Sequence, residues 1–124
     1  MITSTSNQQM KNLLQITESP IEKLELMMDF GRSLVAVPDD AICSEISGCA
    51  SFVQICRVGD KFYGRADSDI VRGIVAIVLA MIDGKSIRQI KDMDIVGEFN
   101  SLNLNLGAGR LNGLNAIAVF LQNL

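Results

Sequence analysis

One segment of the chain, IVRGIVAIVLAMI at residues 70–82, is apolar on nearly every side. An Asp-Ser-Asp sequence precedes it and suits the N-terminus of a helix, while a Gly-Lys pair at positions 84 and 85 suits its end. A helix without a polar face has to be covered by other parts of the fold. Its uninterrupted apolar run, residues 74–82, is too short to cross a bilayer. The sequence therefore predicts a buried central helix with the rest of the chain packed around it.

Apolar residues at helical spacing and capping residues predict further helices along the chain. Ser6 and Ser86 are candidate N-caps, and Ser19 is an N-cap candidate followed by proline at the first helical position. The predicted helices cover residues 7–16, 20–35, 87–91 and 111–124, with a further helical turn at 94–100.

The segment SFVQICRV at residues 51–58 is rich in β-branched and aromatic residues, with Val53 and Ile55 on one face and Gln54 on the other. A Gly-Asp pair follows and predicts a hairpin into a second strand at residues 61–66. A third strand is compatible with the sequence, but the sequence does not locate it. Since strands and helices do not alternate, we expect an α+β fold in which several helices pack on one small antiparallel sheet of two or three strands.

The chain has 124 residues, 48% of them hydrophobic, which is enough for a single domain over residues 1–124. Residues 1–18 are expected to be an N-terminal extension or a short helix. The formal charge is −3 and the basic residues are scattered, which disfavours nucleic-acid binding. The N-terminal sequence lacks the basic and apolar regions of a signal peptide. We therefore expect a cytoplasmic protein without membrane attachment, either a monomer or a homodimer.

The chain contains no histidine, which excludes Ser–His and Cys–His catalysis and histidine metal ligation within it. Its three cysteines are an odd number without the CxxC spacing of zinc sites, so a reducing compartment is the simpler interpretation. Cys56 lies in a predicted strand and is expected to be structural. Cys43 lies in a connection with loop signals, VPDDAICSEISGC, and is open to being either a passive or a resolving thiol.

Cys49 differs from the other two cysteines because Gly48 precedes it and Ala50 and Ser51 follow it. Small neighbours let another macromolecule approach the sulfur, and glycine permits a tight loop tip. No lysine or histidine adjoins the thiol to lower its pKa, so it suits exchange with a docked partner better than stand-alone catalysis. From the local sequence alone, an ordinary loop cysteine is an equally good interpretation.

Two other features have the composition of a ligand site. Asp67 and Asp69 resemble a carboxylate pair, but no third ligand lies nearby in the sequence, so helix capping is the favoured interpretation. The glycines of LGAGRLNG, residues 106–113, follow no predicted strand and lack the spacing of a nucleotide-binding loop. The sequence therefore predicts no bound cofactor and no metal.

Three blocks, EISGCASFVQI, YGRADSDIVRGIVAIVLAMIDGKS and GRLNGLNAI, together resemble the SufE family of sulfur acceptors, the partners of group II cysteine desulfurases in iron–sulfur cluster assembly. The resemblance runs from about Ile21 to Ile117, with the blocks in the family's order. It implies a SufE- and IscU-like fold. Family members usually carry a tryptophan where this chain has Gln54.

The resemblance implies that Cys49 accepts sulfur as a persulfide from a desulfurase of the SufS or CsdA type and delivers it to an iron–sulfur scaffold. Arg110 is implied as a contact for the desulfurase, and Gly48, Asp67 and Asp69 are expected at the same interface. The protein would then stimulate the desulfurase as an accessory carrier rather than act as an enzyme. Pyridoxal phosphate would belong to the partner, and this chain would need no cofactor.

Two alternatives remain open at this point. In the first, the three cysteines would hold an iron–sulfur cluster, as in scaffold proteins of the U type. In the second, the protein would be a small thiol redox protein in which Cys43 resolves Cys49.

Overall fold

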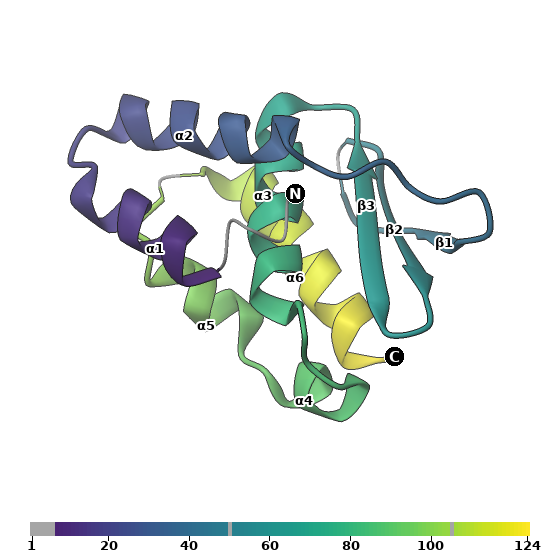
Figure 1. The fold of residues 1–124 in the computed structure, drawn as a ribbon. Helices are drawn as coiled ribbons and strands as arrows, with labels where there is room; N and C mark the ends of the chain where they lie inside the picture. Colours follow the sequence, from purple (N-terminus) through teal and green to yellow (C-terminus); the bar gives the residue numbers. More distant parts are fainter. Residues whose placement is uncertain (1–6, 50, 105) are drawn as a thin grey trace.

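The computed structural model describes residues 7–49, 51–104 and 106–124. Within these ranges the chain forms six helices and three strands, and the strands make one antiparallel sheet. In chain order the elements are α1 (Asn7–Ile16), α2 (Pro20–Arg32), β1 (Ile42–Glu45), β2 (Val53–Val58), β3 (Lys61–Ala66), α3 (Asp69–Ile82), α4 (Ile87–Asp92), α5 (Ile95–Asn100) and α6 (Ala108–Gln122). Figure 1 shows the sheet on one side of α3, with α1, α2 and α5 on the other. The predicted α+β fold is confirmed.

The central element is α3, as its apolar sequence predicts. Residues 73–78 are all buried, and Val75 and Val78 are fully inaccessible to solvent. The strand β3 packs on one side of α3 and α2 on another, while α1, α5 and α6 complete its surroundings. Gly84 then turns the chain with a φ of 77°. Among the described residues, no helix is both long and apolar enough to cross a membrane.

The helices α2 and α3 cross at two glycines. A Cβ at Gly73 would overlap the backbone carbonyl of Met27, and a Cβ at Gly31 would lie only 2.7 Å from the backbone nitrogen of Gly73. The two helix backbones therefore touch where neither carries a side chain. This close crossing explains why a glycine interrupts the otherwise apolar sequence of α3.

The sheet has the order β1-β2-β3, and its inner face packs against α3. Gly59, with a φ of 59°, makes the predicted hairpin between β2 and β3. Val53 and Ile55 are buried on the inner face, as their alternation predicts. Gly64 lies opposite Ile55, and a Cβ there would overlap the side chain of Val75. A glycine at this position therefore lets β3 lie close against α3.

The third strand, β1, is the element that the sequence did not locate. The placement of Cys43 in a loop is wrong, because Cys43 lies in β1 directly opposite Cys56 of β2. The strand is four residues long and lies at the edge of the sheet, and Ile42 at its start is 76% exposed. Pairing with β2, rather than an alternating apolar pattern, therefore holds it in place.

The helix predicted at 20–35 ends three residues early, at Arg32. Ser33 terminates it, because the Ser33 hydroxyl donates a hydrogen bond to the carbonyl of Phe30 and satisfies an acceptor of the last turn. At the other end, Ser19 caps the helix as predicted, accepting a hydrogen bond from the backbone N–H of Glu22.

The N-terminal helix α1 belongs to the domain core rather than to an extension. Met10 and Leu14 are buried, with at most 2% of their surface exposed. Its predicted cap, Ser6, lies outside the described residues. The short helix α4 starts as predicted, with Ser86 and Gln89 forming a reciprocal capping box.

Candidate functional site

Cys49 lies in the loop that joins β1 to β2. The disulfide between Cys43 and Cys56 closes the base of this loop, and Cys49 is the free cysteine inside it. All three cysteines of the chain belong to the described residues. Gly48 has a φ of 91°, which favours glycine because other residues rarely adopt it. The structure therefore places Gly48 and Cys49 in a constrained loop, whereas Ala50 lies outside the described residues.

The Cys49 loop packs against α6 at two small residues. The Cys49 thiol donates a long hydrogen bond to the carbonyl oxygen of Gly113, with Sγ 3.8 Å from that oxygen. A Cβ at Gly113 would lie 3.7 Å from Sγ, and a Cβ at Gly48 would lie 3.5 Å from the Cβ of Ala116. Gly113 and Ala116 are three residues apart and face the same side of α6. Together these two positions form the seat of the loop.

The surroundings of Cys49 favour its neutral form. The side chain is half-buried among the residues that border the core, and this burial raises the pKa of the Cys49 thiol above its ordinary value. The Gly113 carbonyl can accept a hydrogen bond only from the protonated sulfur. At neutral pH the resting group is therefore a thiol, sheltered against α6, rather than a reactive thiolate.

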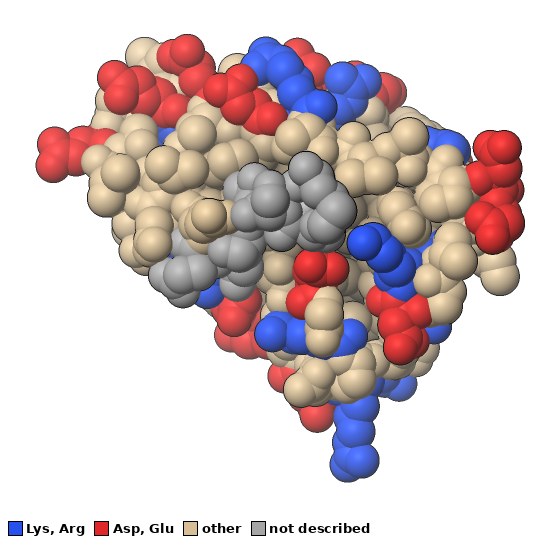
Figure 2. Space-filling view, in the orientation of Figure 1, with Lys and Arg blue, Asp and Glu red and all other residues tan. Residues whose placement is uncertain are grey.

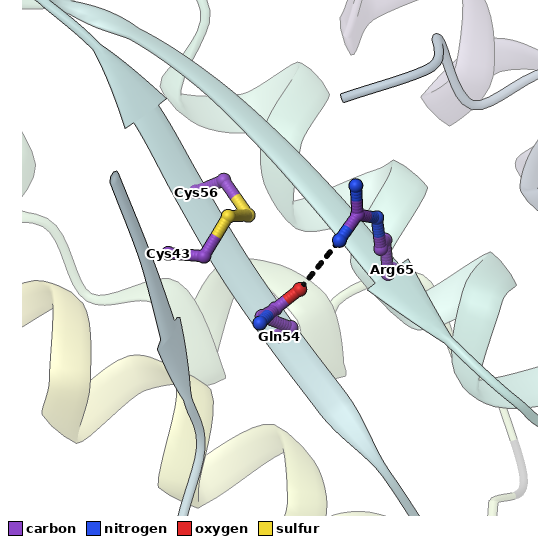
Figure 3. Close-up of a disulfide and its surroundings, with 4 residues drawn as sticks. All are labelled: Cys43, Gln54, Cys56 and Arg65. Carbon is purple, nitrogen blue, oxygen red and sulfur yellow. Dashed lines mark hydrogen bonds between the residues drawn. A yellow bond between two sulfur atoms is a disulfide. The ribbon is translucent and has the colours of Figure 1, made fainter. Parts of the chain in front are cut away.

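The other two cysteines bind to each other on the outer face of the sheet. Figure 3 shows the disulfide on the same face as the hydrogen bond from Arg65 to Gln54, for which the N–O distance is 3.0 Å. Cys56 is 1% exposed, in agreement with a structural role. The hypothesis of a Cys43–Cys49 disulfide is wrong for this structure, because Cys43 is bonded to Cys56 across the β1–β2 pair.

The start of α3 adjoins the far end of the Cys49 loop. The backbone N–H of Asp67 donates to the carbonyl of Phe52, with N and O 3.4 Å apart. Asp69 lies in the first turn of α3, and its carboxylate is 3.2 Å from a guanidinium nitrogen of Arg72. Arg72 also donates through Nε to the carbonyl of Ala66. The N-cap of α3 is Ser68, without a side-chain capping hydrogen bond, so the prediction that Asp67 and Asp69 cap this helix is wrong. Asp69 pairs with Arg72 instead, and Asp67 is exposed beside the loop.

Arg110 lies in the first turn of α6 and is exposed, and its guanidinium donates to the carbonyl of Leu106 at 3.4 Å. Gly113 is three positions further along the chain, so it lies about 4.5 Å from Arg110 along the helix axis and about 60° around it. Because Gly113 contacts Cys49, Arg110 lies one turn away from the seat of the loop. The structure thus brings Gly48, Cys49 and Arg110 together around the N-terminal half of α6.

Sequence reasoning missed the seat of the loop. Gly113 and Ala116 lie more than 60 positions after Cys49, so nothing near the cysteine indicates them. The signal that existed was the pair of small residues at helical spacing in RLNGLNA. In the described ranges, no group of three or more His, Cys, Asp or Glu side chains is placed to hold a metal ion. The geometry offers one half-buried thiol that lies against the backbone of α6.

Comparison with known proteins shows the family to which the chain belongs. The family model of SufE, described as the Fe-S metabolism associated domain, matches residues 8–124. The sulfur acceptor protein CsdE of Escherichia coli is 31% identical over 106 residues, which cover 78% of this chain and 72% of that protein. The cysteine desulfuration protein SufE of Wigglesworthia glossinidia brevipalpis is 34% identical over 110 residues, covering 82% and 76%.

An uncharacterized SufE-like protein of Rhizobium meliloti is 33% identical over 108 residues, which cover 77% of each chain. Among solved structures, a hypothetical protein from Thermus thermophilus has the same fold, with a TM-score of 0.75 over 96% of this chain and 92% of that one. Its sequence is 16% identical, so that likeness concerns the fold alone. The match to the family model covers nearly the whole chain, and the protein therefore belongs to the SufE family.

Proposed function

We propose that this protein accepts sulfur from a cysteine desulfurase as a persulfide on Cys49 and passes it on for iron–sulfur cluster assembly. The observation that carries the proposal is the one free thiol of the chain, held at a glycine-containing loop tip against a small-residue seat on α6. Membership of the SufE family and the similarity to proteins named for sulfur acceptance and cysteine desulfuration support it. The protein is then an accessory carrier that stimulates the desulfurase rather than an enzyme by itself.

The transfer is a thiol exchange at sulfur. The Cys49 thiolate attacks the terminal sulfur of the persulfide that the desulfurase carries, and a new S–S bond forms at Cys49. The S–S bond of the donor breaks, and the donor cysteine leaves as a thiolate that takes up the proton lost by Cys49. Cys49 then bears the S–SH group, and no outside oxidant or reductant is consumed. The same exchange with a thiol of the recipient passes the sulfur onward.

Docking of the partner has to activate Cys49 before this exchange. In the resting structure the thiol is neutral and half-buried, because burial raises its pKa and the Gly113 carbonyl accepts a hydrogen bond from the S–H group. A partner that draws the loop away from α6 exposes the sulfur to water and to charges of its own site, and both changes favour the thiolate. Cys49 is therefore protected from chance oxidation until the donor is present.

The proposed partner is a desulfurase of the SufS or CsdA type, whose pyridoxal phosphate supplies the chemistry that releases sulfur from cysteine. The proposed recipient is an iron–sulfur scaffold. The proposed place is the cytoplasm, where disulfides are rare, so the Cys43–Cys56 disulfide is expected to exchange there with reducing thiols. A scaffold role for this chain is less well supported, because Cys43 and Cys56 are bonded to each other and leave one thiolate for a cluster.

The test is sulfur transfer from labelled cysteine. The protein is mixed with a SufS-type desulfurase and sulfur-labelled cysteine, and bound label is measured on a gel run without reductant. We expect the wild-type protein to acquire label and Cys49→Ser to acquire none. Labelling of Cys49→Ser at the wild-type level would sink the proposal.

The matched control removes the other two sulfurs. A Cys43→Ser/Cys56→Ser variant retains only Cys49 and is expected to acquire about one label per chain, as the wild type does. A variant of this kind that folds but stays unlabelled would assign the acceptor role to the disulfide pair instead.

A further inference from the structure

A groove of about 600 Å³ lies between the end of α2 and the end of β3. Its volume is within the range of roughly 300–1,000 Å³ that is usual for ligand-binding clefts. The residues on which its chemistry depends are Arg32, Val35, Phe52, Arg65, Asp67 and Arg72. No step of sulfur transfer at Cys49 uses these side chains.

The groove is basic, whereas the chain as a whole is acidic. Three arginines line it, Arg32, Arg65 and Arg72, and one acid, Asp67; Arg32 and Arg72 are also paired with Asp29 and Asp69. The net charge of the whole chain is −3, so the groove opposes the general charge of the molecule. In the face drawn in Figure 2, Asp and Glu gather over the outer end of α2, and Lys and Arg lie among further Asp and Glu where α2 approaches the sheet. Such a contrast favours an anionic partner group.

The three arginines retain capacity to bind carboxylates. Each guanidinium has five N–H donors, and Arg65 donates one hydrogen bond to Gln54 on the outer face of the sheet (Figure 3). Arg32 and Arg72 form ion pairs with acids three residues earlier in their own helices, and these pairs are at least 42% exposed. Exposed pairs of this kind contribute little to stability. An incoming carboxylate can therefore replace or join them at low cost.

The groove also leaves apolar surface in water. Val35 is 44% exposed and Phe52 is 39% exposed, and both line it. A ligand that combined carboxylates with apolar groups would bury these side chains and pair with the arginines in one contact. A helix is about 10 Å wide and fills roughly 400 Å³ per turn, so the groove would hold less than two turns. One wall belongs to β3, an edge strand, which suits an extended chain better.

The groove adjoins the Cys49 loop. Phe52 is three residues after Cys49, so even a fully extended chain would put their Cα atoms at most about 11 Å apart. The Phe52 carbonyl also accepts the backbone N–H of Asp67, which fixes this end of the loop to the groove wall. A segment bound in the groove would therefore hold the rest of its protein beside the acceptor thiol.

We propose that this groove docks an extended segment of the cysteine desulfurase in which carboxylate side chains alternate with apolar ones. The carboxylates pair with Arg32 and Arg65, and the apolar side chains cover Val35 and Phe52. The inference rests on the proposed function for the identity of the partner. The bound segment anchors the desulfurase and leaves its persulfide-bearing loop free to reach Cys49.

The test measures affinity and sulfur transfer separately. Fluorescently labelled protein is titrated with the desulfurase at low and moderate salt, as wild type, as Arg32→Glu/Arg65→Glu and as Arg88→Glu, a control on the exposed surface of α4. We expect the double variant to raise the Kd at least tenfold and to flatten its salt dependence, with Arg88→Glu close to wild type. Sulfur loading at saturating desulfurase should stay at the wild-type level, because Cys49 is intact. A double variant that binds like Arg88→Glu overturns the groove inference.

The two proposals fail differently. If wild-type protein binds through the groove but acquires no sulfur on Cys49, the proposed function falls and the docking groove stands. If Cys49 is loaded at low protein concentration equally well in the double variant, the groove inference falls and the function stands. Unfolding midpoints that match the wild type show that the charge reversals leave the fold intact.

Overlapping 12-residue synthetic peptides covering the desulfurase sequence test the extended segment itself. We expect one acidic peptide to bind the wild type and not Arg32→Glu/Arg65→Glu. Absence of any such peptide overturns the extended-segment proposal. Sedimentation that finds a wild-type dimer dissociated by the double variant would also overturn it, by assigning the groove to a second copy of this chain.

Discussion

The sulfur of Cys49 lies 3.8 Å from the carbonyl oxygen of Gly113, at a position of α6 that carries no side chain. The thiol therefore meets the helix backbone directly, and a Cβ at Gly113 would lie in contact with the sulfur. A persulfide adds one further sulfur atom at this place. We interpret Gly113 as the residue that gives the resting loop room for the carried sulfur.

Replacing Gly113 by alanine should lower the yield of persulfide on Cys49 without lowering the free energy of unfolding. The new methyl would lie 3.7 Å from Sγ, an ordinary contact, and alanine is favoured over glycine in a helix interior by up to about 1 kcal/mol. We expect the free energy of unfolding to be unchanged or higher. The persulfide would lose its space, so the yield of persulfide on Cys49 should fall several-fold in the labelled-cysteine assay.

Asn115→Ala is the matched control for this change, because Asn115 is an exposed residue of the same helix. It should alter helix propensity alone and leave the persulfide yield as in the wild type. Equal yields in Gly113→Ala and Asn115→Ala would show that the space beside Gly113 is not used.

Burial raises the pKa of the Cys49 thiol, which predicts how its reactivity depends on pH. Alkylation by iodoacetamide requires the thiolate, so the pH–rate profile of the folded protein should lie at higher pH than that of the same protein in urea. In the absence of reductant Cys49 is the one free thiol of the chain, so the rate reports on it alone. Coinciding profiles would contradict a sheltered thiol.

The same pKa difference has a consequence for stability. Since the folded state favours the neutral thiol, Cys49 contributes stability below the pKa of the unfolded thiol, and this contribution is lost as the pH rises through the folded pKa. We expect the urea midpoint to decline over this alkaline range more steeply in the wild type than in Cys49→Ser. Identical declines in the two proteins would count against the prediction.

The disulfide between Cys43 and Cys56 should stabilise the fold and restrain the Cys49 loop, because it closes the base of that loop. A sequence separation of 13 residues corresponds to a loss of unfolded-state entropy of about 3 kcal/mol. Cys43→Ser/Cys56→Ser should therefore lower the free energy of unfolding by roughly this amount, measured in urea. Alkylation of Cys49 should become faster, because β1 is a short edge strand that leads directly into the loop.

Addition of a reductant is the internal check. It should lower the midpoint of the wild type toward that of Cys43→Ser/Cys56→Ser and leave the double variant unchanged. A wild-type midpoint that is insensitive to complete reduction would argue against a stabilising disulfide.

The elements that were predicted correctly are those that their own residues indicate, without reference to distant parts of the chain. The apolar run of α3 requires burial wherever it occurs, and the Gly-Asp pair after β2 encodes a hairpin in two residues. The strand β1 carries no such signal, because its four residues, ICSE, show no clear alternation. Its existence depends on pairing with β2, and the Cys43–Cys56 disulfide depends on the register of that pair. Missing the strand therefore meant missing the disulfide.

In the candidate site, too, the local sequence indicated some residues, whereas others depend on contacts between distant segments. Gly48 and Cys49 are adjacent, so their sequence alone indicated a constrained loop, but the structure shows the sulfur half-buried against α6 rather than freely accessible. The seat at Gly113 and Ala116 is a contact between segments more than 60 residues apart, which no local pattern fixes. The groove beside Phe52 likewise exists only after α2, β3 and the start of α3 have come together.

The crossing of α2 and α3 should depend on its glycines, because the two helix backbones touch there. A Cβ at Gly73 would overlap the carbonyl of Met27, which is backbone and cannot rotate away, so the helices would have to separate along their contact. We expect Gly73→Ala to lower the free energy of unfolding by about 2 kcal/mol or more, although alanine is the better helix former. Gly109→Ala on α6 is the control, because a Cβ there meets nothing within 4 Å, and its urea midpoint should stay level or rise. A Gly73→Ala urea midpoint equal to that of Gly109→Ala would show that α2 and α3 accommodate the added methyl without a loss of stability. The close crossing would then not be required for the packing of these two helices.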